Sequence, residues 1–225
     1  MAQDSLTGKT LGIVHAALWV APIANRYTAE LLPGVRVMTI CDDSLEEEFL
    51  RIGHVPPHNY YRAATYIQFL EQAGANAVLF GCSTMNRTVE YVQPLVGIPV
   101  QQIDAPMMEE AVRLGSRIGM LATLPTTVPS STRLLEQKAA QAGKRITITT
   151  VLRNDAFQKL QQGDRRAHND ILLFEVERLS TQVDVIVLAH VSMSLLEDDV
   201  QGARVPVLNS GRTGFQAMRE LLETV

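Results

Sequence analysis

The amino-acid sequence predicts an α/β protein of two pseudo-symmetric domains, each with a four-stranded parallel sheet flanked by helices. Short aliphatic segments recur without strict alternation of apolar and polar residues, which is typical of strands covered on both faces. Longer amphipathic segments lie between them, as expected of helices. The expected strands are Leu11–Ala17, Val35–Cys41, Asn76–Gly81, Ile98–Gln101, Arg117–Ala122, Arg145–Val151, Val183–Ala189 and Val205–Leu208.

Amphipathic periodicity and glycines predict the helices and their ends. The clearest helical segments are Tyr60–Ala73, Arg133–Ala142 and Ala167–Thr181. Glycine readily adopts the left-handed conformation that ends many helices. The glycines at such positions are Gly34, Gly74 and Gly143.

The chain contains an internal repeat. Gly12 matches Gly119, the segment Asn76–Cys82 matches Asp184–His190, and Pro99 matches Pro206. The spacing is nearly the same in all three matches, which indicates a duplication. We therefore expect one domain of residues 1–102 with 208–225, which contains Cys82, and a second of residues 103–207, which contains His190.

Composition excludes several classes of protein. The chain has 225 residues, of which 46% are hydrophobic, so it can bury a core and is not a disordered chain. A formal charge of −4 argues against a nucleic-acid binder. The longest apolar segment, Leu11–Ala24, contains His15 and is shorter than the roughly 18 residues of a membrane span.

Two cysteines cannot form a disulfide scaffold, which favours a reducing compartment. The polar start of the sequence shows no signal peptide. We therefore expect a cytoplasmic protein with no membrane partner. We also expect a homodimer, the commonest assembly of soluble enzymes.

The strand ends predict where a ligand binds. Parallel sheets bind ligands beyond the carboxyl ends of their strands. Two such halves would bring both sets of strand ends to one cleft between the domains. Because Cys82 and His190 occupy equivalent positions in the repeat, we expect them to approach a ligand from opposite sides.

Cys82 is the candidate nucleophile or proton-transfer group. It follows an aliphatic strand and precedes Ser83–Thr88, which can open a helix. A helix N-terminus stabilises a thiolate, and hydroxyls and backbone N–H groups there can hold a carboxylate. The alternative is a small buried apolar residue, which is what most free cysteines are.

His190 is the candidate partner of Cys82. It also precedes a predicted helix, whose N-terminus disfavours the imidazolium. The neutral ring should then predominate near pH 7 and act as a base, or as an acid once protonated. The alternative is a core histidine bound to a backbone carbonyl.

The first strand of each half ends beside further candidates. Thr123, Thr126 and Thr127 bring three hydroxyls, of which one or two should bind an anionic group and the others cap a helix. The equivalent loop, His15–Val20, is apolar and contains the only tryptophan, Trp19. It could line the pocket against an apolar substituent or bury Trp19 in the core. His15 is a weaker candidate than His190.

No pattern predicts a metal or cofactor. His54 and His58 have metal-pair spacing, but Pro56 and Pro57 between them prevent the helix that would align them. The acidic residues of Asp42–Glu48 suit a solvated helix start. Dinucleotide, P-loop, serine-hydrolase and zinc motifs are missing from the sequence.

Three segments together resemble the aspartate/glutamate racemase superfamily. They are Gly81–Asn86, which contains Cys82, then Ile103–Met107 and Ala122–Thr127. The resemblance covers nearly the whole chain. It implies an enzyme without cofactor or metal that acts on a small carboxylate or a related carbonyl compound. The superfamily includes amino-acid and hydantoin racemases, a maleate isomerase and an arylmalonate decarboxylase.

In the two-base racemases of this superfamily, one cysteine from each half flanks the substrate carbon. By resemblance, Cys82 matches the first cysteine, but the second position holds His190. The threonine usual after the second cysteine is replaced by Val191, and Ser192 offers a hydroxyl instead. This departure puts a two-thiol mechanism in doubt.

Two catalytic functions follow, and a binding protein with an inert Cys82 is the non-enzymatic alternative. The first is a cofactor-independent isomerase that racemises a small carboxylate or amino-acid-like substrate by proton transfer between Cys82 and His190. The second is a lyase of the arylmalonate decarboxylase type, with Cys82 as the single proton donor. The expected substrate-binding residues are Ser83, Thr84, Asn86, Thr123, Thr126, Thr127, Ser192 and His15.

Overall fold

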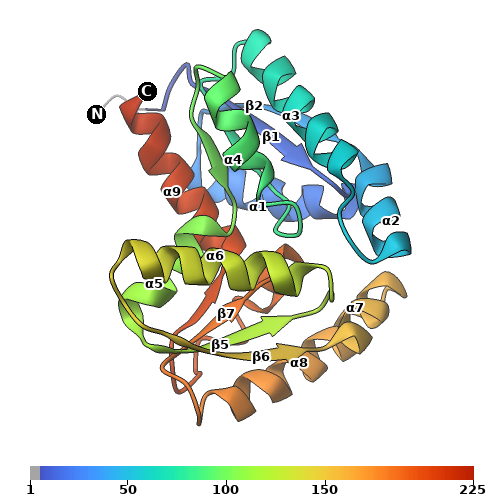
Figure 1. Cartoon of the computed structure of the whole chain (residues 1–225), viewed down its shortest axis with the longest axis vertical. Coiled ribbons are helices and arrows are strands. Elements are labelled where there is room, and N and C mark those ends of the chain that lie inside the picture. Colours follow the sequence, from blue (N-terminus) through green and yellow to red (C-terminus); the bar gives the residue numbers. More distant parts are fainter. Residues whose placement is uncertain (1–5) are drawn as a thin grey trace. The chain divides into compact units, whose positions relative to one another are not determined.

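The structure is a computed structural model that describes residues 6–225. Its contacts divide the chain into two compact units, Met1–Ile103 with Gly211–Val225 (unit 1) and Asp104–Ser210 (unit 2). These bounds lie close to those that the repeat predicts. In residues 6–225, each unit is built on a parallel sheet of four strands, as predicted (Figure 1).

Unit 1 has the strand order β2-β1-β3-β4, and every neighbouring pair is parallel. Its strands are β1 (Thr10–His15), β2 (Arg36–Cys41), β3 (Ala77–Phe80) and β4 (Val100–Gln102). Its helical segments are η1 (Leu18–Val20), α1 (Ala21–Leu31), α2 (Asp43–Ile52), α3 (Pro57–Gln72), α4 (Thr88–Val92), η2 (Gln93–Leu95) and α9 (Ser210–Thr224).

Unit 2 repeats this order as β6-β5-β7-β8. Its strands are β5 (Arg117–Ala122), β6 (Thr147–Leu152), β7 (Val185–Leu188) and β8 (Val207–Asn209). Its helical segments are α5 (Ala105–Leu114), α6 (Thr127–Gln141), α7 (Asn154–Gln161), α8 (Arg165–Leu179) and η3 (Val191–Leu196).

The strand registers support the duplication. Leu11 pairs with Ala77 in unit 1, and Ile118 pairs with Val185 in unit 2. Ile118 follows Leu11, and Val185 follows Ala77, at the spacing that also separates the matched sequence segments. The two sheets therefore place equivalent residues at equivalent points of their strands.

Each sheet is covered on both faces, which explains why the strands lack alternation. In unit 2, Met120 and Val187 pack with one buried cluster, whereas Leu121 and Leu188 pack with another on the opposite face. Helices α5 and α6 contribute to the first cluster and α8 to the second.

The first predicted strand extends too far. The expected strand Leu11–Ala17 ends at His15, and Ala16 and Ala17 are buried but lie outside β1. The chain turns there into η1, with Val20 N–H donating to the carbonyl oxygen of Ala17. In residues 6–225, no helix is long and apolar enough to cross a membrane.

Candidate functional site

The carboxyl edge of the unit 1 sheet positions Cys82. The N–H of Gly81 donates to the carbonyl oxygen of Val14 at 2.9 Å, so β3 stays beside β1 up to the residue before Cys82. Cys82 is half-buried and packs against the cluster that contains Phe80 and Met85. Its side chain is therefore partly accessible at the edge where parallel sheets bind ligands.

The sequence predicts a helix directly after Cys82, and this prediction is wrong. Ser83–Arg87 forms bends and turns, and α4 begins only at Thr88 and spans five residues. The N–H of Asn86 donates to the carbonyl oxygen of Ser83 at 3.4 Å, and that of Thr88 donates to Met85 at 2.9 Å. The surroundings of Cys82 are thus set by a turn and not by a helix dipole.

Three predicted binding residues follow Cys82 in this turn. Ser83, Thr84 and Asn86 are all buried, and Asn86 has no exposed surface. The structure therefore places Ser83, Thr84 and Asn86 in the turn that directly follows Cys82.

His15 ends β1, next to the strand that leads to Cys82. Its side chain is buried, and burial lowers the pKa of the imidazole to about 4. Among residues 6–225, no atom is placed to hydrogen-bond with His15 Nδ1. His15 is thus a neutral ring with an unsatisfied nitrogen at the edge that contains Cys82.

In unit 2, His190 occupies the position equivalent to Cys82. It lies two residues after β7 and directly before η3, and it is 6% exposed. Its Nδ1 is 2.9 Å from Thr123 Oγ1 and 3.1 Å from Ser192 Oγ. The ring also lies against Phe157, with 5.7 Å between the ring centroids. Three predicted site residues, Thr123, Ser192 and His190, therefore form one cluster.

The pKa of His190 is lowered to about 4, first by burial and then by the nearby His168. The expected neutral ring agrees with this direction, but the expected cause was the N-terminus of a helix. Burial is the cause because imidazolium loses its hydration in this position. Nδ1 lies beside two hydroxyls, and the tautomer of the ring decides whether it donates to them or accepts from them.

The other two predicted threonines lie in the turn that follows β5. Thr126 directly precedes α6 but makes no side-chain capping bond, and no described atom is placed to bond its buried Oγ1. Thr127 is buried in the first turn of α6, where its carbonyl oxygen accepts a hydrogen bond from Ser130 Oγ at 2.9 Å. The predicted cap by a threonine hydroxyl is therefore not made by Thr126.

Sequence reasoning missed polar residues beside these edges. Asn154 Nδ2 donates to the carbonyl oxygen of Thr123 at 3.1 Å and so fixes the turn beside His190. Gln102 ends β4 and Asn209 ends β8, and both are buried. The signal for the last two was a polar residue where a short aliphatic strand meets a helix.

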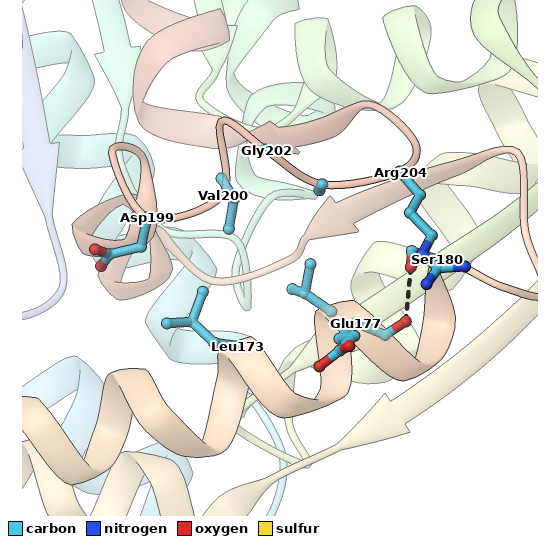
Figure 2. Close-up of a pocket in the computed structure, with 9 residues that line it drawn as sticks. Leu173, Glu177, Ser180, Asp199, Val200, Gly202 and Arg204 are labelled. Atoms are coloured by element: carbon cyan, nitrogen blue, oxygen red, sulfur yellow. Dashed lines mark hydrogen bonds between the residues drawn. The ribbon is translucent and has the colours of Figure 1, made fainter.

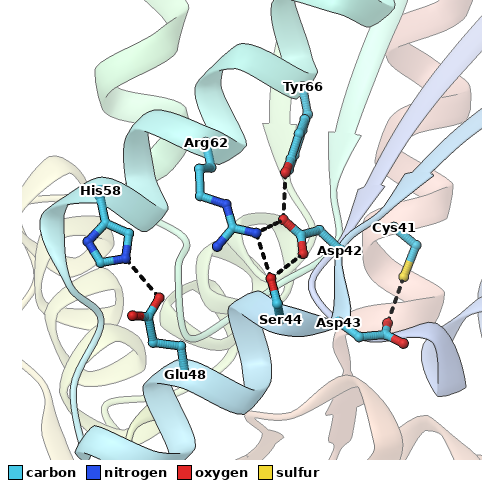
Figure 3. A network of polar contacts seen from close by, with 8 residues as sticks. All are labelled: Cys41, Asp42, Asp43, Ser44, Glu48, His58, Arg62 and Tyr66. Atoms are coloured by element: carbon cyan, nitrogen blue, oxygen red, sulfur yellow. Dashed lines mark hydrogen bonds and ion pairs between the residues drawn. The ribbon is translucent and has the colours of Figure 1, made fainter.

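The acidic segment is a helix start, as the sequence predicts, with Asp43 and Glu47 exposed, and it also contains a network of polar contacts around Asp42 (Figure 3). Asp42 accepts hydrogen bonds from Tyr66 Oη at 2.5 Å and from Ser44 Oγ at 2.7 Å, and it pairs with Arg62. Asp43 accepts from the Cys41 thiol at 3.2 Å. These contacts join the end of β2 to α3.

The two cysteines have different environments. Burial, followed by the contact with Asp43, raises the pKa of Cys41 to about 12. The strand order places β1 between β2, which ends at Cys41, and β3, which leads to Cys82. Cys41 is therefore a protonated thiol away from Cys82 and the turn Ser83–Arg87 that follows it (together the Cys82 turn).

The sequence predicts that no single helix aligns His54 and His58 as a metal pair. His58 lies in α3, whereas His54 precedes it, and His58 Nε2 is 2.8 Å from Glu48 Oε2 (Figure 3). In residues 6–225, no three His, Cys, Asp or Glu residues are grouped to hold a metal ion.

A surface pocket of about 330 Å³ lies in unit 2, between α8 and the segment that leads into β8 (Figure 2). Leu173 and Val200 contribute apolar walls, and Glu177, Asp199 and Arg204 place charges around it. Its lining includes none of the predicted site residues.

Parallel α/β units bind small molecules beyond the carboxyl ends of their strands, where unit 1 has a thiol and unit 2 has an imidazole. The family model described as Asp/Glu/Hydantoin racemase matches residues 55–218. The chain belongs to this family and is an enzyme of the isomerase class, a racemase for an amino-acid-like substrate. A comparison with functionally curated proteins finds no match.

Solved structures of racemases share the fold. Glutamate racemase from Bacillus anthracis is 16% identical with a TM-score of 0.70, and the match covers 97% of this chain and 83% of that one. Aspartate racemase from Picrophilus torridus is 15% identical with a TM-score of 0.70, and the match covers 96% and 94%. Allantoin racemase from Klebsiella pneumoniae is 18% identical with a TM-score of 0.66, and the match covers 96% and 87%.

Proposed function

We propose that the protein is a cofactor-independent racemase in which Cys82 and His190 exchange protons with opposite faces of one carbon of a small carboxylate. The observation that carries this proposal is the equivalence of the two residues. Each lies two residues beyond the third strand of its unit, at the edge suited to ligands. The racemase family supports the reaction class.

The protonation states define the direction of each half-reaction. Neutral His190 removes the α-proton through Nε2, and the Cys82 thiol delivers a proton to the opposite face. This turnover leaves imidazolium and thiolate, the form that carries out the reverse reaction. The burial that lowers the pKa of His190 favours the neutral ring in the resting enzyme.

Hydrogen bonds stabilise the enediolate that forms between the two proton transfers. Ser83, Thr84 and Asn86 surround the carboxylate on the Cys82 side, and Thr126 and Thr127 offer hydroxyls on the other. Neutral His15 donates or accepts a hydrogen bond through Nδ1. Such preorganised groups stabilise charge that develops in the transition state.

Proton exchange in deuterated water tests this proposal. A panel of amino acids and related carboxylates is followed by NMR for deuterium at the α-carbon, inversion and release of CO2. Cys82→Ala should lower racemisation by about 100- to 10,000-fold, the usual contribution of a general acid–base group, while keeping its circular dichroism spectrum. Cys41→Ala is the matched control and should keep full activity.

The His190→Ala variant separates the two mechanisms. It should lose racemisation but keep deuterium exchange from the one enantiomer whose proton faces Cys82. Undiminished racemisation would overturn the role of His190. Release of CO2 with Cys82 as the sole required acid would establish the lyase alternative instead.

A further inference from the structure

We propose that the apolar segment Ala16–Val20 (the β1 loop) determines substrate specificity and selects a carboxylate whose second substituent is apolar and uncharged. This inference rests on the proposed function, because it concerns the ligand that Cys82 acts on. Such a substrate differs from a dicarboxylate by replacing its second charge with a hydrocarbon or aromatic group.

The β1 loop leaves the sheet beside the Cys82 turn. It follows β1 directly, and β1 pairs with β3 in register up to Val14 and Phe80. The β1 loop and the segment after β3 therefore begin at the same edge of the sheet, beyond neighbouring strands. A group bound at Cys82 would meet this loop as its lateral neighbour.

The β1 loop presents apolar surface and no charged side chain. Leu18 is 61% exposed and Trp19 is half-buried, whereas Ala16, Ala17 and Val20 are buried beneath them. An exposed leucine beside an indole ring is suited to an apolar group.

Carboxylates of α2 hold this loop in place. The N–H of Leu18 donates to Asp43 Oδ1 at 2.7 Å, and Trp19 Nε1 donates to Glu46 Oε2 at 2.9 Å. The N–H of Asp42 also donates to the carbonyl oxygen of His15 at 3.1 Å. These hydrogen bonds tie the loop and the end of β1 to the start of α2.

The same carboxylates disfavour a second negative charge on the ligand. Asp43 and Glu46 both bond to the loop, and their charges repel a second carboxylate on the ligand, a repulsion that distance and salt weaken. The cation on the neighbouring helix, Arg62, is paired with Asp42 (Figure 3). A substrate with a second carboxylate would thus meet a negative and apolar surface.

Trp19 makes this inference directly measurable, because it is the only tryptophan in the chain. Its fluorescence can be titrated with 3-phenylpropionate and with succinate, two ligands that share a propionate and differ in a phenyl ring or a second carboxylate. We expect 3-phenylpropionate to change the emission and to bind at least about tenfold more tightly, since burying an aromatic ring yields affinity of this order.

Two variants test the loop and its charges. Leu18→Arg should shift the ratio of the two affinities toward succinate by about tenfold. Leu95→Arg is the matched control, because Leu95 is 63% exposed in the segment before β4, at the other end of the unit 1 strands. Glu46→Gln keeps an acceptor for Trp19 but removes a charge, and should tighten succinate binding about two- to fivefold.

The outcomes are distinct from those of the catalytic proposal. Equal or tighter binding of succinate to the wild-type protein overturns the inference, as does an unchanged Trp19 emission with both ligands. An equal shift with Leu95→Arg also overturns it, because net charge alone would then be the cause. Failure of Cys82-dependent proton exchange counts against the proposed function instead.

Discussion

The His15 imidazole occupies the space above Gly81: its Nδ1 lies 2.7 Å from the position that a β-carbon on Gly81 would take. His15 ends β1, and Gly81 directly follows the neighbouring strand β3 and precedes Cys82. A side chain at position 81 would also approach the carbonyl oxygen of Val14 at 3.3 Å. Glycine at this position thus lets a buried histidine lie beside the Cys82 turn.

Gly81→Ala should therefore displace the His15 ring and destabilise the protein by about 1–3 kcal/mol, the usual penalty of overpacking. Urea denaturation measures this change. Gly202→Ala is the control, because no atom lies within 4 Å of its added β-carbon. We expect the control to stay within about 0.5 kcal/mol of the wild type.

The clash itself is isolated by a double-mutant cycle. In a His15→Ala background the space above Gly81 is open, so Gly81→Ala should destabilise the protein less than it does in the wild type. Equal effects in both backgrounds would show that the strain lies in the backbone and not in the His15 contact.

Buried neutral histidines predict a loss of stability in mild acid. The pKa of His190 is about 4 in the folded protein and 6.5 in the unfolded chain, so between these values the unfolded chain binds the proton and the native protein does not. Stability should fall as pH drops from about 6.5 to about 4, by up to about 3 kcal/mol for one such group. His190→Gln cannot titrate there and should flatten the curve of urea midpoints against pH. Parallel curves for the two proteins would contradict the lowered pKa.

The two thiols should differ in reactivity. A pKa of about 12 leaves Cys41 almost wholly protonated at neutral pH, and only the thiolate attacks iodoacetamide. Mass spectrometry of timed samples should show alkylation at Cys82 well before Cys41. Asp43→Asn removes one cause of the raised pKa and should speed the labelling of Cys41. Faster labelling of Cys41 than of Cys82 in the wild type would be the opposite result.

Thr123 and Ser192 should act together on His190. Both hydroxyls lie within 3.1 Å of Nδ1, so either can hold the ring when the other is removed. We expect Thr123→Val and Ser192→Ala each to lower kcat/KM less than about tenfold, and the double variant to lose more than the product of the single effects. Purely multiplicative losses would mean that the two hydroxyls act independently.

The sequence predicted the fold well because its signals are local and repeated. Ala77 and Val185 begin aliphatic segments that register in the same way in the two sheets, so one pattern occurs twice. The end of β1 was misplaced because Ala16 and Ala17 are as apolar as strand residues, and nothing in composition marks the turn into η1.

The polar contacts could not be predicted from the sequence. Thr123 and His190 are far apart in the chain and meet only because β5 and β7 are neighbours. The acids at the start of α2 resemble a solvated helix end in sequence, yet Asp42 pairs with Arg62 from another helix. Periodicity shows which residues face a core, whereas the partner of a charge depends on tertiary structure.

Because of helix α9, the two units are completed at different times during synthesis. Helix α9 belongs to the unit formed by the first part of the chain, where Phe215 stacks on Tyr27 with 5.7 Å between ring centroids and Gln101 Nε2 donates to the carbonyl oxygen of Gly214. Residues 104–210 form a continuous segment that can fold as it leaves the ribosome. The unit that starts first is thus the unit completed last, and until α9 emerges the surface around Tyr27 stays open to chaperones and to aggregation.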